Sequence, residues 1–451
     1  MRNASHRPLV LGSLVMLAAL LVVLIRVLQA DFVATDPGPR GGPPGAGGPL
    51  PDLSPTELEL FLAGHETIQE IDSVQGTIPD TGLGLGPRFN MDSCGGCHNY
   101  PAPGGSSPPV NPQVAVATKE GATNTVPFFV TIDGPIRRAF IKHQEDGSPD
   151  GSEAHLYTIT GRVDAPGCVL AQPDFDALAA ADNLAWHMPL HLYGAGFLEI
   201  IATPTLVANL AHDRAVKRSL GIAGHPGGPG GVGRFLWKGQ GRDLLGIAAG
   251  AYQSEVGVTN ALFRQENDPT PACQFNALPE DRFNPNAATF IDGLPDFAKI
   301  AGFARFSAPP APIPDTPAIA AGRTLFAQIG CALCHTPALQ TGPSVHAALR
   351  DKTANLYSDV ALHHMGPGLA DGLTQGNAGP DEFRTAPLWG LGQRIFFLHD
   401  GRTTDLVGAI DAHASPGDTN YPPSEANAVI DAFNSLSEQQ KQNILDFLRA
   451  L

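Results

Sequence analysis

The fold is decided by residues 330–337, Gly-Cys-Ala-Leu-Cys-His-Thr-Pro. Cys331, Cys334 and His335 form a C-x-x-C-H pentad, which is the attachment signature of c-type haem. Two thiols at this spacing can each bond one vinyl group of the same porphyrin. The histidine that follows can bind the iron as its proximal ligand. The stretch therefore predicts a covalently bound haem.

A second pentad lies earlier in the chain, where Cys94, Cys97 and His98 have the same spacing. A C-x-x-C pair can also be a thioredoxin-like redox pair or half of a zinc site. The cysteine pairs of a compact zinc site are about 15–20 residues apart, but here more than two hundred residues separate Cys97 from Cys331. A thioredoxin pair does not need the histidine. We therefore expect two covalently bound c-type haems, with His98 and His335 on the irons.

The composition limits the classes of partner. The chain has 451 residues, enough for two or three domains, with 28 Lys and Arg against 44 Asp and Glu. Such an acidic chain is not expected to bind nucleic acid, and a basic electron-transfer partner is the kind that its charge favours. The 51 glycines and 42 prolines indicate long loops.

The first thirty residues read as an export signal. Arg2 and Arg7 precede an apolar run over residues 9–25, and Arg26 follows it. This is typical of a signal peptide, and the run also reaches the lower length limit of a membrane-spanning helix. Residues 1–30 are therefore either a cleaved signal peptide or a retained N-terminal anchor. If they are retained, residues 9–25 form a membrane tether. Both place the rest of the chain in the periplasm or another extracytoplasmic compartment.

Two cysteines lie outside the pentads, Cys168 and Cys273. In an exported protein, two such cysteines are expected to form a disulfide rather than a reactive pair.

Composition also divides the chain. Residues 31–52 are rich in Pro and Gly and predict a flexible linker, and residues 307–315 predict a stiff, proline-rich linker. Between them, residues 53–306 are expected to form an N-terminal haem domain with insertions. Residues 316–451 are expected to form a C-terminal cytochrome c-like haem domain.

Hydrophobic periodicity and capping residues predict the secondary structure. Helices are expected at residues 54–71, 174–183, 205–220, 316–329 and 437–451, and short strands at 114–118 and 126–132. The glycine-rich residues 225–233 lack the context of a nucleotide loop and are expected to form a surface loop. The predicted fold is mainly α, with two cytochrome c-like haem domains, the first enlarged by loops and short β elements.

The second haem needs a further iron ligand, and Met365 is the first candidate. It lies about thirty residues beyond His335 in a Gly/Pro-rich loop, where packing alone explains a methionine poorly. Ligation by His and Met raises the haem potential, as suits an electron-accepting centre. His363 and His364 are the competing candidates.

The first haem has no obvious second ligand. Met91 lies too close to its own pentad, and the candidates that stay open are His65, His187, Met188 and His191. An open or weakly bound iron would suit peroxide chemistry, whereas a fully six-coordinate iron would suit electron transfer alone.

Several segments resemble a known family. They are Gly84–Asn90, Gly194–Glu199, Gly233–Lys238, Glu255–Asn260, Tyr357–Asp359, Met365–Asp371, Phe383–Gly392 and Phe397–Arg402. With the two pentads, they resemble the bacterial di-haem oxidoreductases of the peroxidase type, also called thiol oxidoreductases, which are related to the di-haem cytochrome c peroxidases. The resemblance runs from about residue 56 to the end of the chain.

The resemblance implies two covalent haems, with His/Met ligation at the second, which supports Met365. It also implies that electrons pass from a small donor through the second haem to the first, where hydrogen peroxide is cleaved. Trp237 and Trp389 lie in the shared motifs, either between the haems or simply packed against porphyrin. The family name thiol oxidoreductase has little physical support here, because all four pentad thiols would be bonded to haem.

The chain departs from the family at two places. Residues 186–191 read Trp-His-Met-Pro-Leu-His where relatives read Phe-Arg-x-Pro-x-Pro, so an arginine is lost and His187 and His191 appear. His364 stands where relatives usually have aspartate. The first departure could alter the distal side of a haem, which is the side opposite the pentad histidine.

The preferred hypothesis is therefore peroxide reduction, with electrons entering at the second haem. A carboxylate must then move a proton from the near to the far peroxide oxygen. Glu255 and Glu199 are the candidates in the shared motifs, with Glu255 preferred. The rival hypothesis is a non-enzymatic electron carrier with both irons six-coordinate, and a third is oxidation of another substrate.

Overall fold

The structure is a computed structural model that describes residues 32–41, 45–231 and 233–451. The predicted export signal lies outside these residues. Within them, no helix has both the length and the apolar character needed to cross a membrane.

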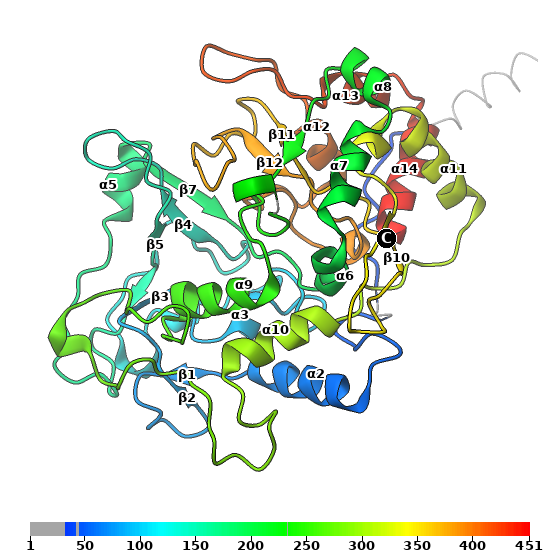
Figure 1. Cartoon of the computed structure of the whole chain (residues 1–451). Helices are drawn as coiled ribbons and strands as arrows, with labels where there is room; N and C mark the ends of the chain where they lie inside the picture. Colours follow the sequence, from blue (N-terminus) through cyan, green and yellow to red (C-terminus); the bar gives the residue numbers. More distant parts are fainter. Residues whose placement is uncertain (1–31, 42–44, 232) are drawn as a thin grey trace, which may run out of the picture.

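Helices predominate over strands in the described residues, and long loops connect them (Figure 1). The α-helices are α2 (Pro55–Thr67), α3 (Cys94–Cys97), α4 (Gln113–Val116), α5 (Phe175–Ala180), α6 (Ala195–Ile200), α7 (Thr203–Ala211), α8 (Arg214–Ser219), α9 (Leu244–Ala251), α10 (Asp296–Phe306), α11 (Pro317–Gln328), α12 (Leu406–Asp411), α13 (Asn427–Asn434) and α14 (Glu438–Ala450). This agrees with the expectation of a mainly α chain with short β elements.

The helix starts follow from local sequence. Ser54 and Ser437 each form a capping box, at α2 and α14, in which the serine hydroxyl accepts from a backbone N–H and a Glu or Gln side chain accepts in return. Thr316 caps α11, and Asp174 caps α5. The predicted helices at these four places are confirmed.

The strands are short and form small, separate sheets. They are β1 (Asp72–Ser73), β2 (Gly82–Leu83), β3 (Arg88–Phe89), β4 (Arg138–Ile141), β5 (Glu153–Ala154), β6 (Tyr157–Thr158), β7 (Leu184–His187), β8 (His225–Pro226), β9 (Leu339–Gln340), β10 (Thr353–Ala354), β11 (Ala361–His364) and β12 (Glu382–Arg384). The larger sheets have the orders β5-β4-β7 and β12-β11-β8. Because β8 precedes residues 307–315 and β11 follows them, the second sheet joins the two sides of the proline-rich segment.

One pair of packed helices lies near each pentad (Figure 1). Helix α2 packs against α10 near the first pentad, and α11 packs against α14 just before the second. Gly322 of α11 lies so close to the Asn443 carbonyl of α14 that a Cβ would collide with it. A larger residue there would separate the helix pair that leads into the second pentad.

Three secondary-structure predictions are wrong. Residues 114–118 lie in helix α4 and the loop after it rather than in a strand, because Pro112 begins a helical turn there. Residues 126–132 form turns, since Pro127 accepts a turn hydrogen bond from Val130. The expected helix 205–220 is divided into α7 and α8 at Asp213, whose φ of 56° no continuous helix allows.

The predicted flexibility of residues 31–52 is also wrong for the described part. Asp36 forms a buried ion pair with Arg449 of α14, with 2.6 Å between Oδ2 and Nη2. Ala34 and Leu50 are buried as well. The Pro- and Gly-rich composition removes regular structure here, but the segment is packed: Asp36 contacts α14, and Leu50 packs beside Phe61 and Phe306.

The predicted disulfide is confirmed, since Cys168 and Cys273 are joined. Both cysteines are buried in the core cluster that also contains Cys97. The bridge links a loop before α5 to the short turn Pro271–Cys273.

Candidate functional site

The second pentad forms a tight turn directly after helix α11. Gly330 takes a φ of 104°, which only glycine adopts easily, and a 3-10 turn follows at Cys331–Leu333. The His335 amide donates to the Cys331 carbonyl at 2.9 Å, which closes the turn. The two thiols and the imidazole therefore lie together on one compact loop.

A largely apolar cavity opens beside this loop. It holds about 1410 Å³ of space free of atoms, part of it open to solvent. Cys331, Cys334, His335 and Met365 all line it. Its other walls include Trp237, Phe326, Phe383, Leu388, Phe397, His399, His413 and Phe433. The cavity can therefore hold a large flat apolar group beside the pentad.

Both pentad histidines are oriented in the way that a metal ligand requires. The Nδ1 of His335 lies 3.0 Å from the Tyr357 carbonyl, and the Nδ1 of His98 lies 3.2 Å from the Gly105 carbonyl. An N–H donated from Nδ1 leaves Nε2 free as an electron-pair donor to metal. Burial lowers the pKa of both rings, to about 4 for His335. A neutral imidazole is the form that binds metal.

The pentad thiols do not resemble a reactive redox pair. Burial raises the pKa of Cys331 to about 12, and it also raises the pKa of Cys94 and Cys97. Reactive C-x-x-C pairs have lowered thiol pKa values. This environment favours the haem interpretation over the thioredoxin one.

The two competitors of Met365 have carboxylate partners. His363 lies between Asp359, 3.0 Å from Nε2, and Glu425, 2.6 Å from Nδ1. His364 Nδ1 lies 3.0 Å from Asp381. His363, Asp359 and Cys334 could also hold a metal ion, but only if the Cys334 thiol were not bonded to haem.

Two arginines give the cavity a strong preference for anions. Arg384 and Arg394 line it and are buried, and among the described residues neither forms an ion pair with a carboxylate. The Nε of Arg394 has no hydrogen-bond partner. Burial lowers the pKa of both guanidinium groups to about 10. Arg384 donates to the Leu236 and Thr385 carbonyls. Buried guanidinium groups without a counter-charge are nevertheless costly, and the two carboxylates of a haem would supply the counter-charges, so these residues fit a haem.

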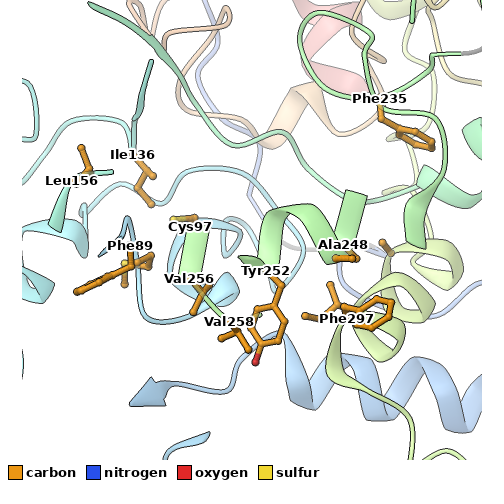
Figure 2. Packing of buried hydrophobic residues seen from close by; sticks show 14 of the residues in the cluster. Phe89, Cys97, Ile136, Leu156, Phe235, Ala248, Tyr252, Val256, Val258 and Phe297 are labelled. Atoms are coloured by element: carbon orange, nitrogen blue, oxygen red, sulfur yellow. The ribbon is translucent and has the colours of Figure 1, made fainter. Parts of the chain in front are cut away.

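The first pentad lies in another part of the molecule. Cys94 and Cys97 begin and end the short helix α3, and the Gly95 amide donates to the Ile68 carbonyl at 2.6 Å. Figure 2 shows Cys97 within the buried cluster that includes Val256 and Ile136. The loop of the first pentad is therefore held in place by the core that surrounds it.

Glu255 lies close to this first pentad. It occupies a π-helical turn, Tyr252–Val256, that continues α9, and such turns often mark functional sites. Its carboxylate lies 2.8 Å from Arg138, which also binds Glu153. The Glu255 charge is the main factor that opposes the lowering of the His98 pKa by burial. The structure thus brings Glu255 together with the first pentad.

Glu199 has a different environment. Its carboxylate accepts from Arg305 at 2.7 Å and from the backbone N–H of Leu244, the first residue of α9. These contacts join α6, α9 and α10, so they account for the residue as a structural carboxylate. Among the described residues, no hydrogen bond or ion pair connects the Glu199 side chain to either pentad.

Three of the four open ligand candidates for the first haem lie elsewhere or have partners. His65 stacks on Phe61 at the edge of α2. His187 Nε2 lies 2.9 Å from Asp371. The sulfur of Met188 lies 3.9 Å from Arg394, beside the second cavity.

His191 differs from these three. It is partly exposed, and desolvation of its ring together with Arg394, Arg384 and His98 lowers its pKa to about 3. Its Nδ1 has no hydrogen-bond partner. His191 is therefore near enough to Arg384, Arg394 and His98 for their charges to act on its ring.

The two motif tryptophans occupy different places. Trp237 lines the second cavity and donates to the Met188 carbonyl at 2.8 Å. Trp389 packs in the core cluster that contains Cys97, although it belongs to the C-terminal half. Trp237 thus touches the second site, and Trp389 joins the two halves.

A buried charge network was missed by sequence reasoning. Lys238 Nζ and His187 Nε2 bind the two oxygens of Asp371, at 2.8 and 2.9 Å. Lys238 also lies over the Phe383 ring, 4.0 Å from its centre. The shared family motifs contain Lys238, Asp371 and Phe383. Their place in these motifs was the signal from which the network could have been predicted. Arg138 and His413 carried no such signal.

These features define a protein with two C-x-x-C-H pentads, one of them beside a cavity that fits a haem. A family model described as "Di-haem oxidoreductase, putative peroxidase" matches residues 208–451. The chain belongs to this di-haem oxidoreductase family, as the sequence motifs predicted. The matched region includes the second pentad, and the first pentad lies before it.

Solved structures give weaker similarity. A MauG-like protein associated with microbial copper homeostasis has a TM-score of 0.26 at 18% identity, and the match covers 37% of this chain and 55% of that protein. Hydrazine synthase of Kuenenia stuttgartiensis has a TM-score of 0.37 at 14% identity, covering 93% of this chain and 98% of that one. The diheme peroxidase BthA of Burkholderia thailandensis has a TM-score of 0.36 at 13% identity, covering 93% and 94%. No curated protein sequence matches. Scores this low support no argument about activity.

Proposed function

We propose that the chain is an exported di-haem c-type oxidoreductase that reduces hydrogen peroxide. Family membership supports an oxidoreductase of the peroxidase type. The observation that carries the finer proposal is the carboxylate at the first pentad, where Glu255 and Arg138 lie close to His98. The second pentad instead faces a cavity with apolar walls and two arginines. The two sites thus differ in the way that separate catalytic and electron-entry roles require.

Each haem would be held by residues of its own pentad. Cys94 and Cys97 would bond the first, and His98 would bind its iron. At the second, Cys331, Cys334 and His335 would have these roles, and Met365 is the predicted sixth ligand. Bound haem would supply a one-electron redox centre at each site and, at the first, the iron at which the peroxide bond breaks. The predicted domains, residues 53–306 and 316–451, would each contain one haem.

Glu255 is the proposed proton carrier. Reduction of hydrogen peroxide to two water molecules consumes two electrons and two protons, and one proton must move from the near to the far oxygen. Arg138 holds Glu255 in place at 2.8 Å, and a carboxylate fixed at this position is the group proposed to carry the proton. Glu199, in its structural contacts, is not needed for this step.

The acidic surface and the disulfide support the proposed partners and location. A net charge of −16 favours a basic electron-donor protein at the second haem. Disulfides persist in oxidising compartments, so the Cys168–Cys273 bond supports a periplasmic location, reached through the predicted signal of residues 1–30.

One observation favours the rival, a non-enzymatic electron carrier. His191, whose Nδ1 has no hydrogen-bond partner, is close enough to His98 for that residue to lower its pKa. If His191 bound the first iron tightly, both irons would be six-coordinate and peroxide would find no open site. Cyanide would then bind poorly to the wild-type protein and well to His191→Ala.

The deciding experiment measures peroxide turnover by the haem-loaded protein with a reduced donor, in the fully oxidised and half-reduced states. We expect turnover, and a loss of about 100-fold in Glu255→Gln, the usual scale for a lost acid–base group. Glu145→Gln, at an exposed acid, is the matched control and should match wild type. Absent turnover in both states, with a low-spin spectrum that cyanide does not change, would establish the electron carrier instead.

A further inference from the structure

Besides His335, the imidazoles of His363, His399 and His413 line the cavity beside the second pentad, and no motif predicted His413. His413 follows helix α12, and both His335 and His413 line the cavity. Their ring centres lie 6.5 Å apart, with 60° between the ring planes. No ring contact of this kind involves His98 in the part of the chain that the structure describes.

This separation matches two axial ligands of one metal. Metal–imidazole bonds are about 2.0–2.1 Å long, and the ring centre lies about 1.2 Å beyond the bonded nitrogen, so two rings on opposite sides of one iron have centres about 6–6.5 Å apart. The planes of axial imidazoles can take any twist about the bond axis, so an angle of 60° is compatible.

His413 is also oriented as a ligand. Its Nδ1 lies 2.8 Å from the Ala409 carbonyl in the last turn of α12, just as the Nδ1 of His335 lies against the Tyr357 carbonyl. Donation from Nδ1 leaves Nε2 as the free electron pair. His363 and His364, by contrast, pair with carboxylates. His413 thus combines a free Nε2 with a position in the cavity.

We propose that His413, rather than Met365, is the second axial ligand opposite His335. Met365 then serves as an apolar wall, in keeping with its packing beside Trp237, Leu369 and Phe383. The inference rests on the proposed haem at the second pentad. It changes the character of that haem, because ligation by His and Met raises the potential and two imidazoles give a lower one.

The test is spectroscopic and does not depend on turnover. In oxidised, haem-loaded protein, we expect low-spin bis-imidazole signals in electron paramagnetic resonance from one haem, and no near-infrared band of a thioether-bound iron. Met365→Leu should leave this spectrum unchanged. His413→Ala should lose the bis-imidazole signals. His413→Met, which keeps a ligand and most of the volume, should gain the thioether band and shift the midpoint potential upward.

The contrary result is equally clear. A thioether band in wild type that disappears in Met365→Leu and persists in His413→Ala would overturn the inference and establish Met365 as the ligand. His143→Gln, at an exposed histidine, controls for the loss of any imidazole. If these spectra behave as expected but peroxide is not turned over, the ligand inference stands and the proposed peroxidase function fails.

Discussion

Gly194 lies directly against the indole ring of Trp389, so that a Cβ on Gly194 would come within 2.5 Å of the ring atom Cζ2. Gly194 also has a φ of 72° at the start of α6. The contact joins a loop near the first pentad to the motif that follows β12. The halves of the chain therefore meet at a place where only glycine fits.

Gly194→Ala should lower the free energy of unfolding by more than backbone strain alone, about 1–3 kcal/mol, because the indole must also move. Chemical denaturation of the haem-loaded protein measures the loss. Gly221→Ala is the matched control, since Gly221 has a φ of 81° but no atom within 4 Å of the added carbon. Equal losses in the two variants would show that the contact with Trp389 is unimportant.

Arg394→Met should have opposite effects on the haem-free and haem-loaded protein. Without haem, the variant removes a buried, unpaired charge and should raise the free energy of unfolding by about 1–3 kcal/mol. With haem, it should leave a carboxylate without its partner and lower that energy by about 3–5 kcal/mol. Denaturant titrations of both forms test this, with Arg282→Met, at an exposed arginine, as the control. If the free energy of unfolding changed in the same direction in both forms, the role of Arg394 as a partner of a haem carboxylate would be contradicted.

Asp36→Asn should destabilise the protein in a pH-dependent way. Burial raises the Asp36 pKa, but Arg449 and the N–H groups of Gly38 and Leu406 outweigh it, and the net pKa is lowered. The stabilisation is therefore present above the unfolded-state pKa of about 3.9 and is lost as the pH falls through the lower folded-state pKa. At neutral pH, removing one partner of this buried pair should cost about 3–5 kcal/mol.

Thermal unfolding between pH 7 and pH 3 measures this effect. The difference between Asp36→Asn and wild type should shrink as the pH falls. Asp315→Asn breaks an exposed pair with Arg323 and should have little measurable effect, because surface ion pairs contribute little. A difference that stays constant down to pH 3 would be inconsistent with a lowered Asp36 pKa.

Replacing Cys168 and Cys273 together by alanine should lower the free energy of unfolding by about 2–5 kcal/mol, since the bond closes a long loop. The absorption spectrum of the haems should not change, because no pentad cysteine is involved. Urea denaturation compares the variant with wild type. Unchanged stability would mean that the unfolded chain gains no freedom when the bond is lost.

Local signals predicted much of this molecule correctly. Ser54, Asp174, Thr316 and Ser437 act through hydrogen bonds within a few residues, so their helix starts could be read from the sequence. The pentads and the cysteine pair were found because their chemistry fixes their spacing or their compartment. Family membership followed from the same motifs.

Long-range contacts could not be predicted in this way. The pairing of Arg138 with Glu255 and the approach of His413 to His335 join residues far apart in sequence, and no spacing rule encodes them. The apolar residues 114–118 fit a strand or a buried helix equally well. The break between helices α7 and α8 depends on the left-handed backbone of Asp213, which the surrounding sequence does not reveal.

The Cys168–Cys273 bond implies a sorting problem during biogenesis. Six cysteines can pair in roughly 15 ways, and the cysteines within each pentad are far closer in sequence than the 105 positions that separate Cys168 from Cys273. Shorter loops close more easily, so an oxidant acting on the new chain would first join the thiols of each pentad. Under the proposed covalent attachment of haem, those bonds would have to be reopened by thiol exchange before haem could be bonded to the pentads. The yield of mature protein should therefore depend on reducing power delivered to an oxidising compartment.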